Sequence, residues 1–353
     1  MSTENLITLS EKPFKRGLAD GDGAFIKRLI DEYKKGAANW WNQIINHKEL
    51  FVGIREEYLN VYYKGCSLVM LELKDGELIG HTHYKYLVHP QGDSPYVRFE
   101  SGILKDETAF LENVVLHYQN IAEIIKASEF YTGDEAKIVH QILMANAENY
   151  LDTEIAFQRI AKKEDSEKEI NKQDRIDLAL LDEDENGQGK IYFCEVKQVN
   201  DSRLYSTKRP EVVDQMLRYY EILNSKGRKS EIIDSYRTVC SNLISIYGNH
   251  DRPEDKWLNK LRKFSHKDSI LKVFEKPILL IVGEKSEWEK HKKNRVGLGC
   301  ISLGDDEENK FGIVIGLWDA KDEKDFSLDE IKKAIKTAEA NTHTKAANRR
   351  QRE

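Results

Sequence analysis

Two residues that could do chemistry come at the end of a strongly apolar segment, IYFCEVK. Glu195 and Lys197 share one face of the predicted strand, because successive strand residues point to opposite sides. Both faces of the segment begin with apolar residues, so the strand is expected to be covered on both sides. Ionised groups at the end of such a strand are costly unless they pair, bind a metal or do chemistry.

A second carboxylate, Asp177, lies in the preceding apolar run, almost symmetric with Glu195 about Asn186-Gly187. A strict two-residue turn there would place Asp177 opposite Val196 and point it away from Glu195. We therefore expect an odd-length loop or a bulge within DEDENGQG. The two carboxylates then converge and can share Mg²⁺, for which Mn²⁺ can substitute, beside the ammonium of a lysine.

This order, an Asp on one strand and E-x-K at the end of the next, resembles the PD-(D/E)xK nuclease superfamily. The match lies in Asp177 and in Glu195-Val196-Lys197, while Ile176 stands where the family has Pro. The resemblance implies a restriction-endonuclease-like fold and metal-assisted hydrolysis of a phosphodiester. It also implies a magnesium site at Asp177, Glu195 and Val196.

The resemblance extends to the helix predicted over residues 210–223. Gln215-Met-Leu-Arg-Tyr219 is similar to the Q-x-x-x-Y motif of the RecB-like branch, so Gln215 and Tyr219 join the expected catalytic set. The glutamine could reach a phosphate or a metal-bound water. Members of the superfamily often carry an acidic residue on the helix before the first strand, and here Glu135 is preferred to Glu148.

Phosphate contacts are expected from Arg203, Lys208 and Arg209, which follow E-x-K. The charge balance favours this region, because residues 1–196 carry 23 Lys/Arg against 35 Asp/Glu, whereas residues 197–300 carry 22 against 14. A polyanionic substrate requires such a positive segment. The alternative is that these lysines belong to solvated helix faces.

Three other features carry less weight. His81 and His83 lie two apart on a predicted strand without an evident third metal ligand. Gly297-Leu298-Gly299 lacks the strand-turn-helix context of a phosphate-binding loop. Cys194 should face away from Glu195, which makes a nucleophilic role improbable.

The elements that must position the site fall into two groups. Residues 22–35 predict an amphipathic helix, four β-rich runs over residues 49–87 predict an antiparallel meander, and a helix is predicted over residues 111–130. After Gly133 the pattern is helix, three strands and the helix that carries Gln215. Further helical sequence and the strand PILLIVGE follow, then the apolar run FGIVIGLWDA and a helix near residues 327–340.

We therefore predict an N-terminal α+β domain at residues 1–126, an α/β domain at 127–340 with a mixed sheet flanked by helices, and a tail at 341–353. With 40% hydrophobic and 33% charged residues the chain has the composition of a soluble globular protein, and its apolar runs are too short to span a bilayer. No secretory signal is visible, so we expect a cytoplasmic location and reduced cysteines.

The function predicted from these residues is a magnesium-dependent nuclease acting on nucleic acid, DNA rather than RNA. Restriction or anti-phage defence is preferred by analogy, with repair and mobile-element processing open. A catalytically silent scaffold of the same fold and a metal hydrolase of small phosphoesters are the alternatives. A protein partner or homodimer stays open, and no membrane is expected.

Overall fold

The computed structural model describes residues 8–9, 12–18, 23–86, 96–100, 103–104, 121–163, 166–206, 210–225, 227–248, 255–291, 298, 301, 311–320 and 322–337. The chain forms two compact units. Unit 1 contains residues 1–14, 141–233 and 271–353, and unit 2 contains residues 15–140 and 234–270.

This division differs from the predicted single boundary after residue 126. The N-terminal strand β1 (Thr8–Leu9) pairs with a strand of unit 1, so the start of the chain belongs there. In unit 2, Leu18 N donates to Asn242 Oδ1 at 3.0 Å, which ties residues 234–270 to the N-terminal segment. These contacts join segments more than a hundred residues apart. The predicted tail at 341–353 lies outside the described residues.

Unit 2 is built on a six-stranded antiparallel sheet in the order β2-β3-β4-β5-β6-β7, which confirms the predicted meander. Its strands are β2 (Phe51–Ile54), β3 (Tyr58–Tyr63), β4 (Cys66–Lys74), β5 (Glu77–His83), β6 (Tyr96–Glu100) and β7 (Ile103–Leu104). The turns at Lys64-Gly65 and Asp75-Gly76 have positive φ at both residues, as tight hairpins require.

Helices complete unit 2. They are α1 (Ala24–Lys34), α2 (Trp40–Asn46), α3 (Ile121–Glu129), the first part of α4 (Asp134–Ala145), most of α6 (Arg228–Tyr247), and α7 (Lys256–Ser265). Helix α1 turns Phe25 and Leu29 inward and packs against β4 and β5. Of the helix predicted over residues 111–130, the described part is α3.

Unit 1 is built on a seven-stranded sheet in the order β1-β8-β9-β10-β12-β13, with β11 also paired to β10. The strands after β1 are β8 (Tyr150–Lys163), β9 (Ser166–Glu183), β10 (Gly189–Gln198), β11 (Leu271–Val273), β12 (Ile278–Gly283) and β13 (Ile313–Trp318). The pairs β1-β8, β8-β9 and β9-β10 are antiparallel, and β10-β11, β10-β12 and β12-β13 are parallel. The predicted mixed α/β sheet flanked by helices is confirmed at this level.

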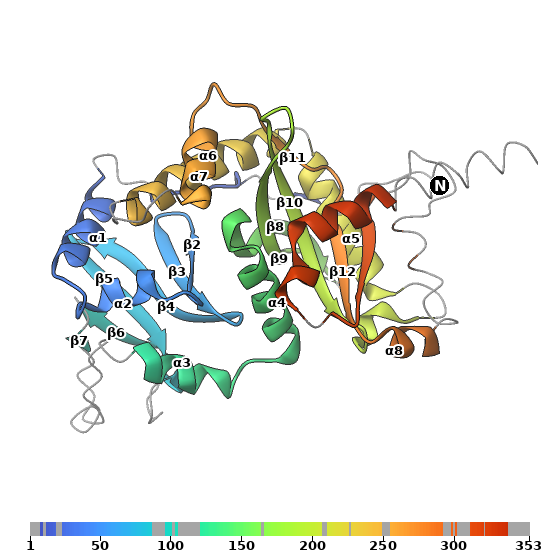
Figure 1. The fold of residues 1–353 in the computed structure, drawn as a ribbon, viewed down its shortest axis with the longest axis horizontal. Helices are drawn as coiled ribbons and strands as arrows, with labels where there is room; N and C mark the ends of the chain where they lie inside the picture. Colours follow the sequence, from blue (N-terminus) through green and yellow to red (C-terminus); the bar gives the residue numbers. More distant parts are fainter. Residues whose placement is uncertain are drawn as a thin grey trace, which may run out of the picture. The chain divides into compact units, whose positions relative to one another are not determined.

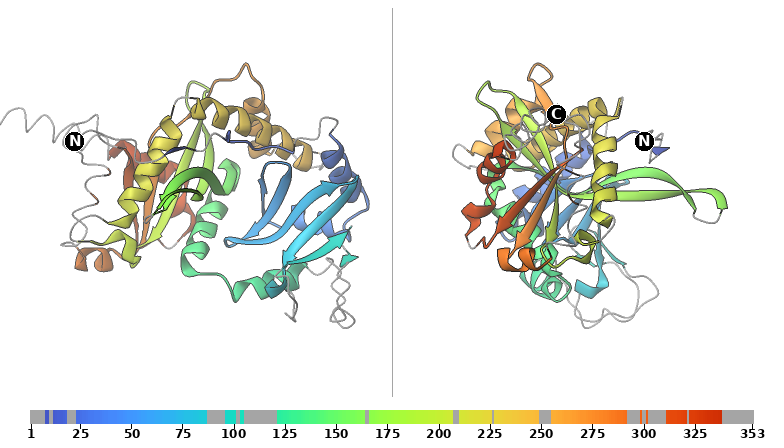
Figure 2. Two further views of the ribbon diagram at one scale, coloured as in Figure 1. Left: turned by 180° about the vertical axis from the view of Figure 1, so that it is seen from behind. Right: turned by 90° about the vertical axis from the view of Figure 1, so that its right-hand side faces the viewer.

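Helices lie on both faces of the unit 1 sheet. The helix α5 (Glu211–Asn224) and the helical residues 328–337 cover opposite faces, as the two opposite views in Figures 1 and 2 show. Strands β10 and β12 are buried along almost their whole length, which is the pattern of strands covered on both sides. Unit 1 also contains the short helix α8 (Lys285–Lys290).

The sequence between residues 230 and 271, predicted as helical, forms two helices and the start of a strand. Asp255 caps α7, because its carboxylate accepts hydrogen bonds from the backbone nitrogens of Trp257 and Leu258. As residues 234–270 belong to unit 2, much of the basic third quarter of the chain folds with that unit. The predicted phosphate-binding segment is therefore divided between the two units.

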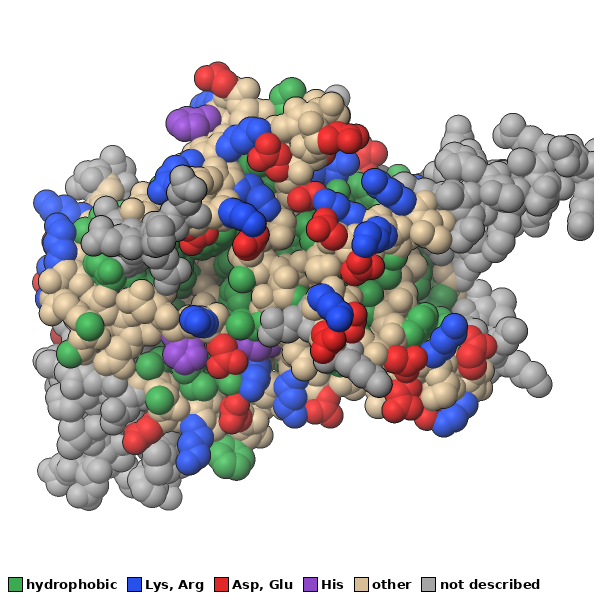
Figure 3. All heavy atoms as spheres, in the orientation of Figure 1, with side chains coloured by type: hydrophobic (Ala, Val, Ile, Leu, Met, Phe, Trp, Pro, Cys, Tyr) green, Lys and Arg blue, Asp and Glu red, His purple; other side chains and the backbone are tan. Residues whose placement is uncertain are grey.

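The described surface mixes both signs of charge. On the face shown in Figure 3, Lys and Arg side chains lie among Asp and Glu side chains. Within the described ranges, no helix is long and apolar enough to cross a membrane.

Candidate active site

The hairpin of β9 and β10 determines how the two carboxylates meet. Its loop is odd in length, residues 184–188, closed by a hydrogen bond of 2.9 Å from the backbone nitrogen of Asp184 to the carbonyl of Gln188. The paired residues of β9 and β10 run as far as Cys194 opposite Leu178, so the next step along both strands places Glu195 opposite Asp177. The expectation of an odd-length loop is thus confirmed, and a one-residue slip would separate the two side chains.

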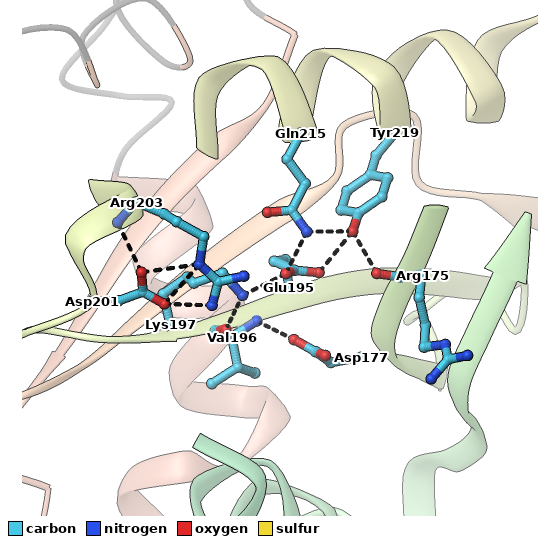
Figure 4. A network of polar contacts seen from close by, with 9 residues as sticks. All are labelled: Arg175, Asp177, Glu195, Val196, Lys197, Asp201, Arg203, Gln215 and Tyr219. Carbon is cyan, nitrogen blue, oxygen red and sulfur yellow. Dashed lines mark hydrogen bonds and ion pairs between the residues drawn. The ribbon is translucent and has the colours of Figure 1, made fainter. Parts of the chain in front are cut away.

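Glu195 lies at the centre of a network of polar contacts (Figure 4). Its Oε1 accepts hydrogen bonds from Lys197 Nζ at 2.5 Å and from Gln215 Nε2 at 2.7 Å. Its Oε2 accepts from the hydroxyl of Tyr219 at 3.1 Å. The glutamate and the lysine are only 2% and 1% exposed, so their charges are compensated almost entirely by one another and by these neighbours.

Asp177 is held from the neighbouring strand. Its Oδ2 accepts a hydrogen bond from the backbone nitrogen of Val196 at 2.7 Å, which fixes the carboxylate beside the E-x-K segment. Burial, followed by the negative charge of Glu195, raises the pKa of Asp177 well above its ordinary value. A buried carboxylate whose pKa is raised by a second carboxylate marks a place where a cation is favourable.

The residues present fit a hard divalent cation. Asp177, Glu195 and the carbonyl of Val196 offer oxygen atoms only, the ligand type that Mg²⁺ prefers. The ammonium of Lys197 already donates to Glu195 Oε1 and, at 2.8 Å, to the oxygen of Val196, so a positive charge contacts two of the three predicted ligands. No cluster of three His, Cys, Asp or Glu side chains that could hold a metal occurs in the described part of the chain. Water and substrate would supply the other ligands.

Helix α5 brings Gln215 and Tyr219 to Glu195 from one face of the sheet. Four residues separate the two side chains, so they lie one turn apart on the same side of the helix. Gln215 Nε2 also donates to the Tyr219 hydroxyl at 2.6 Å, and that hydroxyl shares its one proton between Glu195 Oε2 and the carbonyl of Arg175. The contacts give both residues the role of positioning Glu195, whereas the sequence predicted that Gln215 reaches the phosphate or a metal-bound water.

Of the three residues predicted to contact phosphate, only Arg203 lies within the described residues, and it already has a carboxylate partner. The Arg203 guanidinium pairs with Asp201, with Nη2 to Oδ2 at 2.5 Å, so its charge is largely compensated. Although burial acts to raise it, hydrogen bonds from Arg203 keep the pKa of Asp201 below its ordinary value. Lys208 and Arg209 lie outside the described residues.

The predicted acidic residue Glu135 lies in the first turn of α4, in the part of that helix that belongs to unit 2. The other predicted catalytic residues, Asp177, Glu195, Lys197, Gln215 and Tyr219, belong to unit 1. Glu148 lies in a short 3₁₀ helix, Ala147–Asn149, and is exposed.

Two residues near Asp177 were missed by the sequence analysis. Glu154 on β8 has a positive φ of 54° and stands opposite Asp177, since its neighbours Thr153 and Ile155 pair with the residues on either side of that aspartate. Its negative charge contributes to the raised pKa of Asp177, after burial and Glu195. Spacing alone could not reveal it, because its position depends on the register in which β8 pairs with β9.

The other missed residue is Arg175, which shares a strand face with Asp177 two residues away. Its side chain is 56% exposed and pairs with Glu154 at 3.1 Å. The alternation of β9 could have revealed it. An exposed guanidinium on the face that carries Asp177 can contact a phosphate.

The remaining sequence candidates are not part of this site. Cys194 is fully buried, and burial raises the pKa of its thiol, so it is unsuited to act as a nucleophile. His81 and His83 lie in unit 2, and Leu298 is the one described residue of the Gly-Leu-Gly segment.

Comparison of the chain with protein-family models, with curated proteins and with solved structures gives no significant match.

Proposed function

We propose that this chain is a magnesium-dependent nuclease that hydrolyses phosphodiester bonds, with DNA as its substrate. The observation that supports it is the convergence of Asp177, Glu195 and Lys197 at the end of β10. Helix α5 adds two residues that hold the glutamate. We assign unit 1 to the restriction-endonuclease-like fold, an assignment supported by a hairpin that carries both carboxylates next to parallel strands.

In this proposal Asp177 and Glu195 bind the cation, together with the carbonyl of Val196. Mg²⁺ would lower the pKa of a bound water and neutralise charge on the phosphate. Lys197 presents its ammonium beside Glu195, where it can orient a water molecule or stabilise negative charge that develops on the phosphate. Arg175 is paired with Glu154, but its side chain is 56% exposed and could exchange this partner for a neighbouring phosphate.

Gln215 and Tyr219 support this chemistry indirectly. Each contacts a different oxygen of Glu195, so the carboxylate cannot rotate without breaking a hydrogen bond to α5. A ligand held in a fixed orientation loses less freedom when a cation binds. This supports a working site over a scaffold that has kept only the fold, because a scaffold has no need of an oriented carboxylate.

The test is to incubate the purified full-length protein with plasmid, single-stranded DNA and RNA, with Mg²⁺ or with EDTA. We expect cleavage of DNA that depends on Mg²⁺ and is lost in Asp177→Asn, Glu195→Gln and Lys197→Met. These replacements preserve side-chain size better than alanine, because the site is buried. Glu185→Gln, in the exposed loop of the same hairpin, is the matched control and should cleave normally.

The alternatives predict different outcomes. A scaffold would cleave nothing, and a hydrolase of small phosphoesters would act on a mononucleotide ester while leaving plasmid intact. Equal activity of Asp177→Asn and the wild type would reject the assignment of the site itself.

A further inference from the structure

A cavity of about 630 Å³ lies in unit 2 and is lined by none of the residues of the candidate active site. Its floor is the polar face of the meander, where Asn60 pairs with Met70 and Met70 pairs with His81 across three strands. The alternate residues Leu59, Leu71 and Thr82 are buried on the opposite face. A volume of this size suits a small ligand.

One cation of this cavity lacks a carboxylate partner. The ammonium of Lys85 lies 5.0 Å from the ring centroid of Tyr86 and 5.2 Å from that of Tyr131, and no carboxylate of the described residues pairs with it. In contrast, Lys64 donates to Glu129 at 2.8 Å. The cavity therefore presents one uncompensated positive charge between aromatic rings, which favours an anionic ligand.

Aromatic side chains surround this charge, with Tyr86 buried. The rings of Tyr86 and Tyr131 have centroids 6.2 Å apart, and the tilted ring of His83 lies beside Tyr86 at 6.1 Å. Tyr131 is 53% exposed, so part of its ring is open to a planar ligand. Burial and the nearby Lys85 charge lower the pKa of His83, so this part of the rim is neutral at pH 7.

The floor offers an unused hydrogen-bond acceptor. Asn60 Nδ2 donates to the Tyr62 hydroxyl at 2.9 Å, while Asn60 Oδ1 is buried and accepts no hydrogen bond from any described residue. A buried polar atom without a partner costs free energy. Because Asn60 lines the cavity, a rotation of its side-chain amide would turn this oxygen toward an N–H donor of a ligand, such as the amino group of a nucleobase.

We propose that this cavity binds a nucleotide, with the base against Tyr131, its amino group toward Asn60 and the phosphate at Lys85. The three features match the three parts of such a ligand: an aromatic rim, an unpaired acceptor and an uncompensated cation. The nucleotide can be free or part of a single strand. The inference does not depend on the nuclease proposal, because it uses none of the residues of unit 1.

The test is calorimetric titration of the full-length protein in EDTA with each of the four 5′-mononucleotides and with a single-stranded hexanucleotide. Inorganic phosphate and the free nucleosides serve as partial ligands. We expect saturable binding that is tightest for a base with an amino group, and weaker binding of either part alone. The mononucleotide and the hexanucleotide distinguish the two sources of the ligand.

Two variants at the rim test the placement. Tyr131→Ala should raise the dissociation constant about 5- to 150-fold, the range for loss of one base-stacking contact. Lys85→Gln should weaken binding of nucleotides but not of nucleosides. The matched controls are Phe130→Ala, next to Tyr131 and 85% exposed, and Lys137→Gln, an exposed lysine paired with Asp134.

Because Lys85 and Tyr131 lie at the rim, the variants should fold, and their melting temperatures check this. Absence of saturable nucleotide binding by the folded wild type would overturn the proposal. So would binding that both rim variants leave unchanged. The cleavage-deficient Glu195→Gln protein should still bind, which separates failure of this inference from failure of the nuclease proposal.

Discussion

Replacing Tyr219 with phenylalanine removes a single hydroxyl from the candidate site and preserves the ring. That hydroxyl accepts a hydrogen bond from Gln215 Nε2 at 2.6 Å, donates to the carbonyl of Arg175 and lies 3.1 Å from Glu195 Oε2. The side chain is 1% exposed, so water cannot easily take over these contacts. The substitution therefore tests whether α5 positions the glutamate.

The magnitude follows from the number of contacts and their burial. A hydrogen bond to a charged group contributes about 1.5–3 kcal/mol, and a buried polar group left without its partner costs about 1–3 kcal/mol. Phenylalanine leaves no cavity in the core, so this loss is the main effect. We expect Tyr219→Phe to lower the free energy of unfolding by about 1–3 kcal/mol. If the same free energy is lost from the reacting complex, the cleavage rate falls about 5- to 150-fold.

The assay compares single-turnover cleavage rates over a series of Mg²⁺ concentrations, together with urea unfolding. Tyr220→Phe is the control, because it removes a hydroxyl from the next residue of the same helix and that residue is only half-buried. The prediction is a lower rate and a higher Mg²⁺ midpoint for Tyr219→Phe, with wild-type values for Tyr220→Phe. Wild-type rate and Mg²⁺ midpoint in Tyr219→Phe would refute the positioning role, even if stability fell.

Three further predictions concern the charges of the site. Removal of Mg²⁺ by EDTA should abolish cleavage, and added Mn²⁺ should restore it; undiminished cleavage in excess chelator would contradict this. Because burial and Glu195 raise the folded-state pKa of Asp177, the folded state binds its proton more tightly, and stability falls as pH rises from the unfolded pKa through the folded one. Asp177→Asn should therefore melt at a higher temperature than the wild type at pH 7 in EDTA. A lower melting temperature would contradict the claim that the ionised Asp177 carboxylate destabilises the metal-free protein. Arg175→Gln, in a Glu195→Gln background, should reduce the slope of log K against log salt by about 0.9 for duplex DNA, whereas an unchanged slope would exclude a phosphate contact.

The centre of the candidate site could be predicted from the sequence because it depends on short-range geometry. The alternation of β10 put Glu195 and Lys197 on one face, and the odd-length loop needed to face Asp177 is found at residues 184–188. The i, i+4 spacing placed Gln215 and Tyr219 on one side of a helix. Each of these relations spans at most one hairpin or one helical turn.

What the sequence missed depends on contacts between distant segments or on local irregularity. Glu154 faces Asp177 through the register of β8 against β9, and its positive φ could not be read from the sequence. The positive charge of Arg203 is compensated by Asp201, two residues away. A count of Lys and Arg residues in the sequence therefore overstates the positive charge that can bind a phosphate. The division of the chain into units follows from contacts such as that of Leu18 with Asn242, which linear order cannot reveal.

The buried ammonium of Lys197 has a consequence for the electroneutrality of the site. Two ionised carboxylates and one ammonium leave a net charge of −1, and the pairs Asp201–Arg203 and Glu154–Arg175 add nothing to this sum. One divalent cation changes the total to +1, and the single negative charge of a phosphodiester then returns it to zero. A second divalent cation would leave two positive charges uncompensated beside a buried lysine. The site is therefore matched in charge to one metal ion and one phosphodiester at a time.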